Sequence, residues 1–281
     1  MLMNGLARKR PAAAPPFRYI PYVRTAILVA TYDQPRWLDL ALRGWSRQSR
    51  RPDAVVVADD GSGPETAEVV GRWGAVHVRR ERAGGRFGKC GAVNDAVRRA
   101  RELGCEFALF TDGDCLPARD LLERHAAVAR PGRFAAGGVI RLTRRMSETL
   151  TPEAVDRGDF ETGRGGDKRG YALPRRLGRL LDALNPRRTP WKGGNSSAFL
   201  SDVLRVNGYD ERFGWGSEDK ELGERLAHAG VRGWSIRYSA PVFHLWHERP
   251  YVDEQVVAAN RALLAETRRT RSTWTPAGIQ R

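Results

Sequence analysis

The chain has 281 residues and a formal net charge of +15, because 48 lysine and arginine residues outnumber 33 aspartate and glutamate residues. This length allows one large domain or two small ones with a substantial core, and no apolar run approaches the roughly 18–20 residues that span a bilayer. The three cysteines, Cys90, Cys105 and Cys115, lack C-x-x-C spacing, which argues against a disulfide framework or a zinc site and fits a reducing cytoplasm. Residues 1–20 are rich in Pro and Ala and lack the apolar core of a secretory signal, so a flexible N-terminal tail is expected.

The first half of the chain alternates short apolar runs with segments of helical spacing. Strands are predicted over 25–31, 53–62, 75–80 and 105–112, and helices over 36–49, 64–74, 88–104 and 118–129. Such alternation predicts βαβ units, and therefore a Rossmann-like α/β fold with a mainly parallel sheet flanked by helices.

The second half changes character. A strand is predicted over 133–142 and helices over 201–208 and 217–230. Residues 156–176 are rich in Gly and charge and have no apolar period, so a long flexible loop is expected there, either a lid or a disordered segment. A C-terminal helix and tail are expected over 251–281.

Positive charge is locally dense in residues 141–145, 175–188 and 266–271. A strongly basic surface favours polyanions such as nucleic acid, anionic lipid or phosphorylated substrates. A solubilising surface in an arginine-rich chain accounts for the same charge equally well.

Two carboxylates end the strand predicted over 105–112, in the stretch "LFTDGDC". Side chains at i and i+2 of a strand point the same way, so Asp112 and Asp114 could face one hard cation such as Mg²⁺ or Mn²⁺. The alternative is a turn in which Asp114 caps the next helix. Asp59 and Asp60 also fall at a strand end, and parallel sheets bind ligands at the carboxyl ends of their strands, which favours the metal site.

The stretch "WKGGNSSAFLSDVLRVNGYDERFGWGSEDKELGERLAHAG" resembles the C-terminal half of GT-A fold glycosyltransferases, in the family 2 group and its β-1,4-galactosyltransferase-like relatives with a W-G-x-E-D segment. The resemblance covers most of residues 24–250 and includes "VATYDQPRWL", "VVVADDGS", "GKCGAVNDAV", "TDGDC", "GGN" and "FHLWH" in this order. It implies a single GT-A domain over 21–250, with a nucleotide-sugar half at 21–115 and an acceptor half at 116–250.

The resemblance assigns Asp112 and Asp114 as the D-x-D motif that holds a divalent cation, Mn²⁺ or Mg²⁺. Such a cation stabilises a leaving diphosphate as a Lewis acid. Family members usually add a histidine ligand near the end of the domain, and "FHLWH" offers His244 and His247, of which His247 occupies the usual position. A lone histidine can also be a packed polar residue.

In "GWGSEDKE" the resemblance places the general base at Asp219 and assigns Glu218 to orient the acceptor hydroxyls. Acidic residues at a helix start also suit the helix dipole, which is the alternative. Trp215, held between Gly214 and Gly216, is a good platform for stacking on a sugar. Retaining relatives typically carry Asn at the position of Asp219, so the carboxylate implies inversion.

The implied contacts to the nucleotide and its phosphates are Thr31, Asp60, Gly88, Lys89, Asn94 and Asp112. Backbone N–H groups at a helix start form an anion site, to which Lys89 adds charge; a solvated lysine at a helix start is the alternative. The chain departs from the family at two places: many family 2 proteins carry Asn at the position of Asp33, and "GSGPET" stands where a family member often has an Asp contact. Neither departure touches a proposed metal ligand, and UDP remains the best guess for the donor nucleotide. Backbone could approach the donor sugar or acceptor closely at Gly193, Gly194 and Asn195.

The implied function is an inverting, metal-dependent transfer of a hexose or N-acetylhexosamine from a UDP-sugar to an acceptor hydroxyl. A glycan, a lipid-linked glycan and a small molecule remain open as acceptors. The positive charge favours an anionic acceptor or a peripheral contact at the inner membrane face of a cytoplasmic protein, and nucleic acid is not expected as a partner.

Two alternatives remain. A sugar nucleotidyltransferase usually begins with a Gly-rich loop after its first strand, which "VATYDQPRW" lacks. A non-catalytic basic module for nucleic acid or anionic lipid would interleave basic residues with aromatics along one surface, whereas the tryptophans here sit mostly in helical or motif contexts.

Overall fold

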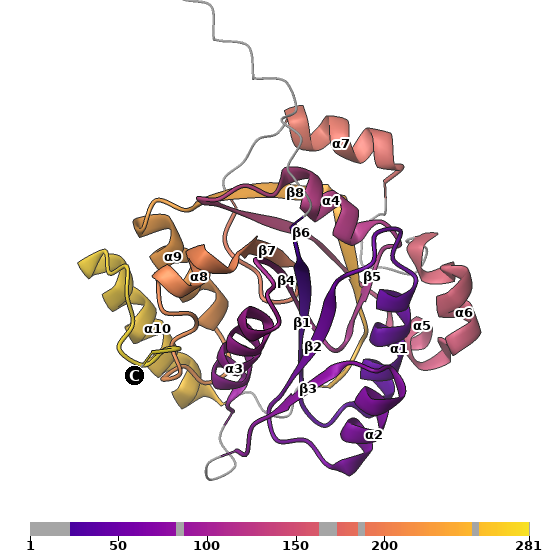
Figure 1. Cartoon of the computed structure of the whole chain (residues 1–281), viewed down its shortest axis with the longest axis horizontal. Helices are drawn as coiled ribbons and strands as arrows, with labels where there is room; N and C mark the ends of the chain where they lie inside the picture. The colour runs from indigo at the N-terminus through magenta and orange to yellow at the C-terminus, as the bar shows by residue number, and fades with distance from the viewer. Residues whose placement is uncertain (1–22, 83–86, 163–172, 185–188, 249–252, 281) are drawn as a thin grey trace, which may run out of the picture.

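A computed structural model describes residues 23–82, 87–162, 173–184, 189–248 and 253–280. Within these residues eight strands form one sheet: β1 (Thr25–Thr31), β2 (Ala54–Asp59), β3 (Val76–Arg79), β4 (Phe107–Asp112), β5 (Cys115–Pro117), β6 (Arg133–Arg141), β7 (Ser196–Phe199) and β8 (Arg232–His244). The α-helices are α1 (Pro35–Ser46), α2 (Pro64–Arg72), α3 (Lys89–Glu102), α4 (Leu121–Val128), α5 (Arg144–Thr149), α6 (Pro152–Arg157), α7 (Arg175–Leu184), α8 (Leu200–Arg205), α9 (Glu218–His228) and α10 (Glu254–Thr270). Figure 1 shows helices packed on both faces of the sheet.

The sheet order is β3-β2-β1-β4-β7-β6-β8-β5. Strands β3, β2, β1 and β4 are parallel, as are β6 and β8, while β7 runs antiparallel between β4 and β6, and β5 runs antiparallel beside β8. The prediction of a mainly parallel α/β sheet is confirmed, and every strand and helix predicted in the first half is present within a few residues of its expected bounds.

The sheet is curled because of one short connection. Only Gly113 and Asp114 separate β4 from β5, yet β7, β6 and β8 lie between these two strands in the sheet order. The far edge of the sheet must therefore come back to the end of β4. The residues of the predicted D-x-D motif lie where the curl closes.

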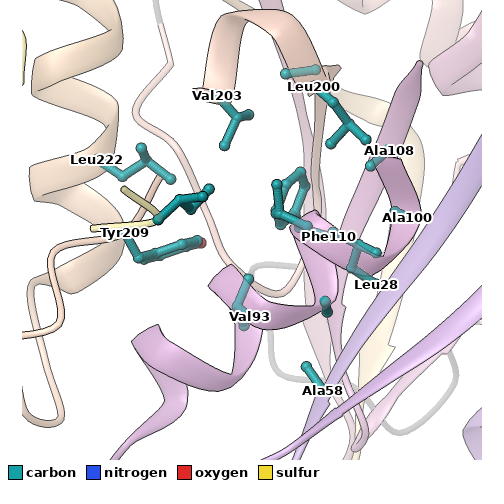
Figure 2. Packing of buried hydrophobic residues seen from close by; sticks show 14 of the residues in the cluster. Leu28, Ala58, Val93, Ala100, Ala108, Phe110, Leu200, Val203, Tyr209 and Leu222 are labelled. Atoms are coloured by element: carbon teal, nitrogen blue, oxygen red, sulfur yellow. The ribbon is translucent and has the colours of Figure 1, made fainter. Parts of the chain in front are cut away.

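Alternating side chains along the strands fill two cores. On one face Leu28 and Phe110 pack with residues of α3, α8 and α9; Figure 2 shows Val93, Val203 and Leu222 from these three helices with Phe110. On the other face Ile27 and Val29 of β1 pack with α1, α2 and α4. A strand buried on both faces reads as a continuous apolar run, which is why β1 is evident from the sequence.

No strand was predicted over β7 or β8, and the structure explains why. Ser196 and Ser197 of β7 are buried polar residues whose hydroxyls hydrogen-bond to the Lys192 backbone and the His125 ring. In β8 the register with β6 shifts, so that residues 237–240 form a bulge that breaks any period of two.

The flexible loop expected over 156–176 is only partly described. Asp156 and Arg157 end α6, and residues 159–162 form a short 3₁₀ helix with Phe160 fully buried against Phe243. This part is therefore ordered, contrary to the prediction, because an isolated phenylalanine carries no periodic signal. Residues 163–172 and the expected tail at 1–20 lie outside the described residues. Among the described helices, none has the length and apolar character needed to cross a membrane.

Candidate active site

Strands β1, β2 and β4 end at one edge, as their parallel register requires. Thr31 is paired with Asp59, and Ala30 with Asp112. A Cβ built on Gly113 would lie 3.0 Å from Thr31 Oγ1, so the buried threonine lies directly beside the turn of the D-x-D motif. The structure thus places Thr31 beside the D-x-D turn; its contact with the nucleotide stays a prediction.

The two carboxylates that follow β2 have different surroundings. Asp59 is fully buried and accepts hydrogen bonds from the Ser62 amide and hydroxyl, so it holds the turn. Asp60 accepts hydrogen bonds from Arg82 and, at 2.9 Å, from the Gly88 amide. Burial raises the pKa of Asp60 above its ordinary value. Asp60 therefore ties the start of α3 to the end of β2.

Lys89, the first residue of α3, lies among carboxylates. Its Nζ is 2.7 Å from Asp112 Oδ1. Burial opposes the charge on Lys89, but the carboxylates, Asp112 and Asp219 foremost, outweigh it and hold the pKa of Lys89 well above its usual range. Burial also raises the pKa of Asp112, although Lys89 opposes the rise. A permanent cation thus lies between the end of β4 and the start of α9.

Asp114 faces two histidines. Its Oδ2 lies 3.0 Å from His247 Nε2 and 3.6 Å from His244 Nε2, and the two imidazole rings stack at 5.3 Å between centroids. Burial opposes ionisation of Asp114, but the charge of His244 and the hydrogen bond from His247 outweigh it and lower the pKa of Asp114 to about 2. A cavity of about 240 Å³ opens beside the rings, lined by Arg141, Leu142, His244, Leu245, Trp246 and His247.

The strand register explains why a histidine meets the D-x-D motif. Cys115 of β5 pairs with His244 of β8, and the Leu245 amide donates to the Asp114 carbonyl at 2.8 Å. Asp114, Cys115 and His244 bring one potential ligand atom each within 4.8 Å of one another. Burial raises the pKa of the Cys115 thiol well above its ordinary value. The carboxylate and imidazole groups at this turn are ligands that suit Mn²⁺ or Mg²⁺.

The Gly193–Gly194 dipeptide lies between the two acidic groups of the site. A Cβ on Gly193 would lie 2.4 Å from Asp219 Oδ1, and a Cβ on Gly194 would lie 3.0 Å from Asp112 Oδ2. Neighbouring Cα atoms are about 3.8 Å apart, so the start of α9 and the end of β4 approach the same point. Any side chain at Gly193 would displace the Asp219 carboxylate.

Asp219 is oriented by a buried aromatic pair. The Tyr209 hydroxyl donates to Asp219 Oδ1 at 3.0 Å, and Trp191 Nε1 donates to the same hydroxyl at 2.8 Å. Burial raises the pKa of Tyr209 well above its ordinary value, so the phenol keeps its proton and acts as a donor. Neither aromatic was predicted as a site residue, although both lie in the stretch that carries the resemblance.

Glu218 lies beside Asp219 at the first turn of α9 and is 7% exposed. Burial, with the neighbouring charge of Asp219, raises the pKa of Glu218 from its ordinary 4.5 to about 7. Glu218 therefore binds a proton more tightly than an ordinary glutamate does.

Glu218→Gln should change how stability depends on pH. Because the folded state binds this proton more tightly than the unfolded state, wild-type stability falls as the pH rises from about 4.5 to about 7. The variant lacks this loss, so its unfolding free energy relative to wild type should rise by up to about 3 kcal/mol between pH 5 and pH 8. Urea unfolding in EDTA measures this. Glu224→Gln, at a more exposed pair with Arg268, should match wild type; equal slopes for all three proteins would contradict the prediction.

The Gly214–Trp215–Gly216 loop is held by α10, which sequence reasoning did not connect to the site. Asn260 is 2% exposed; its Nδ2 donates to the carbonyls of Trp215 at 3.0 Å and Gly216 at 2.7 Å, and its Oδ1 accepts from the Gly214 amide. Gly216 has φ of +98°, which favours glycine. The half-buried Trp215 is thus carried on a fixed loop, and no local sequence signal links it to a residue 45 positions away.

Asn260→Ala should loosen this loop. The substitution leaves the partners of three hydrogen bonds unsatisfied, so the unfolding free energy should fall by about 1–3 kcal/mol. Amide exchange at Gly214, Trp215 and Gly216 should become faster than in the rest of the chain. Urea unfolding and hydrogen exchange test both effects, with Arg261→Ala, the exposed neighbour on α10, as the control. Unchanged exchange in the loop would show that Asn260 does not hold it.

Asn94, a predicted nucleotide contact, lies in the core instead. It is fully buried; its Nδ2 donates to the Tyr209 carbonyl and the Glu211 carboxylate, and its Oδ1 accepts from the Tyr209 amide. Its amide has no group left for a ligand, contrary to the predicted contact. Asn94 instead positions the backbone of Tyr209, which orients Asp219.

Asn195, a predicted acceptor contact, is also fully buried. Its Nδ2 donates to the carbonyls of Gly138 and Ala240, and its Oδ1 lies 2.9 Å from His125 Nε2. Burial lowers the pKa of His125 to about 4, so a neutral ring donates to Asn195. Asn195 joins β6, β8 and α4 behind the Gly193–Gly194 turn and does not face an acceptor.

Comparison with known proteins places this arrangement in a class. The family model for glycosyl transferase family 2 matches residues 26–177, and the model for the N-terminal domain of galactosyltransferase matches residues 176–248. Validoxylamine A glucosyltransferase of Streptomyces hygroscopicus subsp. limoneus is 30% identical over an alignment of 231 positions, which covers 73% of this chain and 48% of that protein. Chondroitin sulfate N-acetylgalactosaminyltransferase 2 of Mus musculus is 41% identical over 63 residues, 22% of this chain and 11% of that protein. The chain spans half or less of the length of these curated relatives.

Solved structures share the fold. The mannosyltransferase PcManGT from Pyrobaculum calidifontis, in complex with GDP-Man and Mn²⁺, aligns with a TM-score of 0.56 at 21% identity over 82% of this chain and 59% of that one. GalNAc-T7 with UDP, GalNAc and Mn²⁺ aligns with a TM-score of 0.62 at 14% identity over 88% and 48%. The chain therefore has the GT-A fold of these glycosyltransferases. Within that class, the chain belongs to glycosyl transferase family 2.

Proposed function

We propose that this glycosyltransferase moves a hexose or N-acetylhexosamine from a UDP-sugar to an acceptor hydroxyl, with inversion at the anomeric carbon. The observation that carries the proposal is the convergence of Asp219 and Asp112 on the Gly193–Gly194 dipeptide. Asp219 is the proposed base, and Asp112 is proposed to help bind the diphosphate. Because both lie next to the same dipeptide, a sugar held between them could undergo a single displacement.

Four side chains fit a divalent cation, which we infer to be Mn²⁺ or Mg²⁺. Asp112 and Asp114 supply carboxylate oxygens, and His247 and His244 supply imidazole nitrogens beside Asp114. His247 Nδ1 lies 2.8 Å from the Glu248 carbonyl oxygen and donates there, so Nε2, which donates to Asp114 in this structure, would give up its proton to act as the ligand nitrogen. When bound, the cation stabilises the charge of the leaving diphosphate. The Mn²⁺ in the two structural relatives supports this choice.

We assign the diphosphate to the start of α3. Lys89 is a permanent cation at the end of β4, and the N-terminal amides of a 14-residue helix point toward the same region. Thr31, Asp60 and Gly88 border this end of the sheet and are proposed contacts for the nucleoside. The donor therefore lies over residues 21–115, and the acceptor over 116–250.

Asp219 is the proposed general base. As the acceptor oxygen bonds to the anomeric carbon and the bond to the diphosphate breaks, the hydroxyl proton passes to Asp219. Tyr209 holds Asp219 Oδ1, so Oδ2 is the oxygen that we assign to this proton. Glu218 and Trp215 are proposed to orient the acceptor, the first through its hydroxyls and the second by stacking on its ring.

Calorimetric titration tests the donor site. UDP, GDP and TDP are each titrated into the protein with Mn²⁺, Mg²⁺ or EDTA. Binding of UDP only with metal supports the proposal, and preference for GDP would move the donor to a GDP-sugar, as in the mannosyltransferase complex. If no nucleotide binds under any condition, a non-catalytic module that binds nucleic acid or anionic lipid would be favoured. If the protein releases pyrophosphate from a nucleoside triphosphate and a sugar phosphate, a sugar nucleotidyltransferase would be favoured.

We place the enzyme in the cytoplasm, with a peripheral contact at the inner membrane face. The support is a net charge of +15, which attracts anionic surfaces. A glycan, a small molecule and a lipid-linked glycan all present the hydroxyl that the site requires, and the last of these would be met at a membrane.

A further inference from the structure

Helix α7 leaves its leucines in water. Leu177, Leu180 and Leu184 are 44%, 53% and 68% exposed, and they make up half of the six large apolar side chains that the described residues leave exposed. Burying apolar surface away from water is favourable, and these exposed leucines forgo that gain. A concentration of three on one ten-residue helix indicates an interaction surface.

The orientation of α7 is fixed by its opposite side. A Cβ on Gly178 would lie 2.5 Å from the Tyr238 carbonyl, so the helix packs closely on the bulge of β8. Asp182, one turn later, accepts the Tyr238 and Ser239 amides at 3.1 Å and 2.9 Å. Because Gly178 and Asp182 occupy the sheet-facing side, the leucines at 177, 180 and 184 point outward. In Figure 1 the helix lies on the outside of the molecule beyond β8.

Cationic side chains border the leucines. Arg176 and Arg179 are exposed on the same helix, and exposed Arg237 of the bulge stacks on Tyr238 at 4.8 Å. Arg237 is close enough to Lys192 to contribute, after burial, to lowering the pKa of that lysine. Leucines flanked by arginines on a surface helix match the composition of helices that lie in the head-group layer of anionic bilayers.

Helix α7 is linked to the candidate active site through the β8 bulge and one hydrogen bond. Ala240, the last residue of the bulge on which α7 rests, accepts a hydrogen bond from Asn195, the residue that follows Gly193–Gly194. We propose that α7 docks the protein on an anionic phospholipid bilayer, with Leu177, Leu180 and Leu184 inserted among the head groups and Arg176 and Arg179 against their phosphates. The further consequence, that the acceptor is lipid-linked and reaches the site from this side, rests on the proposed function.

Vesicle sedimentation in EDTA, without nucleotide, tests the docking separately from transfer. Wild type should bind phosphatidylcholine vesicles containing phosphatidylglycerol at least about tenfold more tightly than pure phosphatidylcholine. Leu177→Ser/Leu180→Ser/Leu184→Ser should weaken binding at least about 30-fold, whereas Val139→Ser/Trp274→Ser, which removes exposed apolar groups elsewhere, should not. Arg176→Glu/Arg179→Glu should abolish the anionic preference, and the matched exposed pair Arg101→Glu/Arg130→Glu should retain most of it.

A labelling experiment covers the case in which the triple variant fails to fold. The native cysteines are buried, so Leu180→Cys accepts an environment-sensitive thiol dye selectively, and Trp274→Cys is the control. The emission of the dye at position 180 alone should shift to shorter wavelength on anionic vesicles. The proposal would be overturned if the emission did not shift, or if all variants bound the vesicles equally. It would also be overturned if the protein bound no vesicles and instead formed a dimer in solution that the leucine substitutions dissociate. Failure of UDP binding would overturn the proposed function and leave this result intact.

Discussion

Asp219→Asn should lower kcat for sugar transfer by about 10²–10⁴-fold while leaving the affinity for UDP within a few-fold of wild type. The amide keeps the size of the side chain and an oxygen for Tyr209, but it cannot accept the acceptor proton. Lys89 loses one of its neighbouring carboxylates but keeps Asp112 at 2.7 Å, so the nucleotide side of the site is preserved. Steady-state kinetics with a UDP-sugar and calorimetry with UDP measure the two effects.

Two controls separate loss of the base from loss of structure. Tyr209→Phe removes the hydrogen bond that orients Asp219 and also the acceptor of the buried Trp191 Nε1–H. We therefore expect kcat to fall less, by about tenfold, and the unfolding free energy to fall by about 1–3 kcal/mol. Glu224→Gln, on the same helix but paired with Arg268, should be fully active. An Asp219→Asn variant that transfers sugar at the wild-type rate would eliminate Asp219 as the base. Loss of UDP binding in the same variant would mean that Asp219 belongs to the donor site instead.

Asp114→Ala should abolish metal-dependent nucleotide binding. Asp114 is the group that brings both histidines to the D-x-D turn, at 3.0 Å and 3.6 Å. Removing it takes away a ligand and the partner that orients two others, so affinity for UDP with Mn²⁺ should fall at least about 100-fold. The residual affinity should be the same in Mn²⁺ and in EDTA, as measured by calorimetry.

The histidines should respond unequally. His247 lies closer to Asp114 and has its Nδ1 fixed by the Glu248 carbonyl, so His247→Ala should weaken Mn²⁺ binding more than His244→Ala. Asp156→Ala, an exposed carboxylate paired with Arg43, is the matched control and should bind as wild type does. Asp114→Ala with unchanged metal dependence would move the cation away from this turn.

Local patterns determined the parallel half of the sheet. Strands such as β1 are buried on both faces, so their apolar runs mark them directly, and parallel register then forces Thr31, Asp59 and Asp112 to one edge. The D-x-D motif, the histidines of "FHLWH" and the acidic pair at the start of α9 are also visible as motifs. Each of these features depends on the types of a few residues that are close together in the chain, so the sequence alone is enough to identify it.

Only the tertiary structure decided what each polar side chain faces. Asn94 and Asn195 lie within motifs, but their side-chain amides make hydrogen bonds in the core. Asn260, 45 residues after Trp215 in the chain, holds the Trp215 loop by a hydrogen bond. The curl that returns β8 to Asp114, and the docking of α7 that turns its leucines outward, depend on contacts between segments distant in sequence. The sequence gives the chemical type of each side chain directly. Its burial and its hydrogen-bond partners are set by packing between segments that are distant in sequence. Burial and partners then decide whether the side chain binds a ligand or stabilises the core.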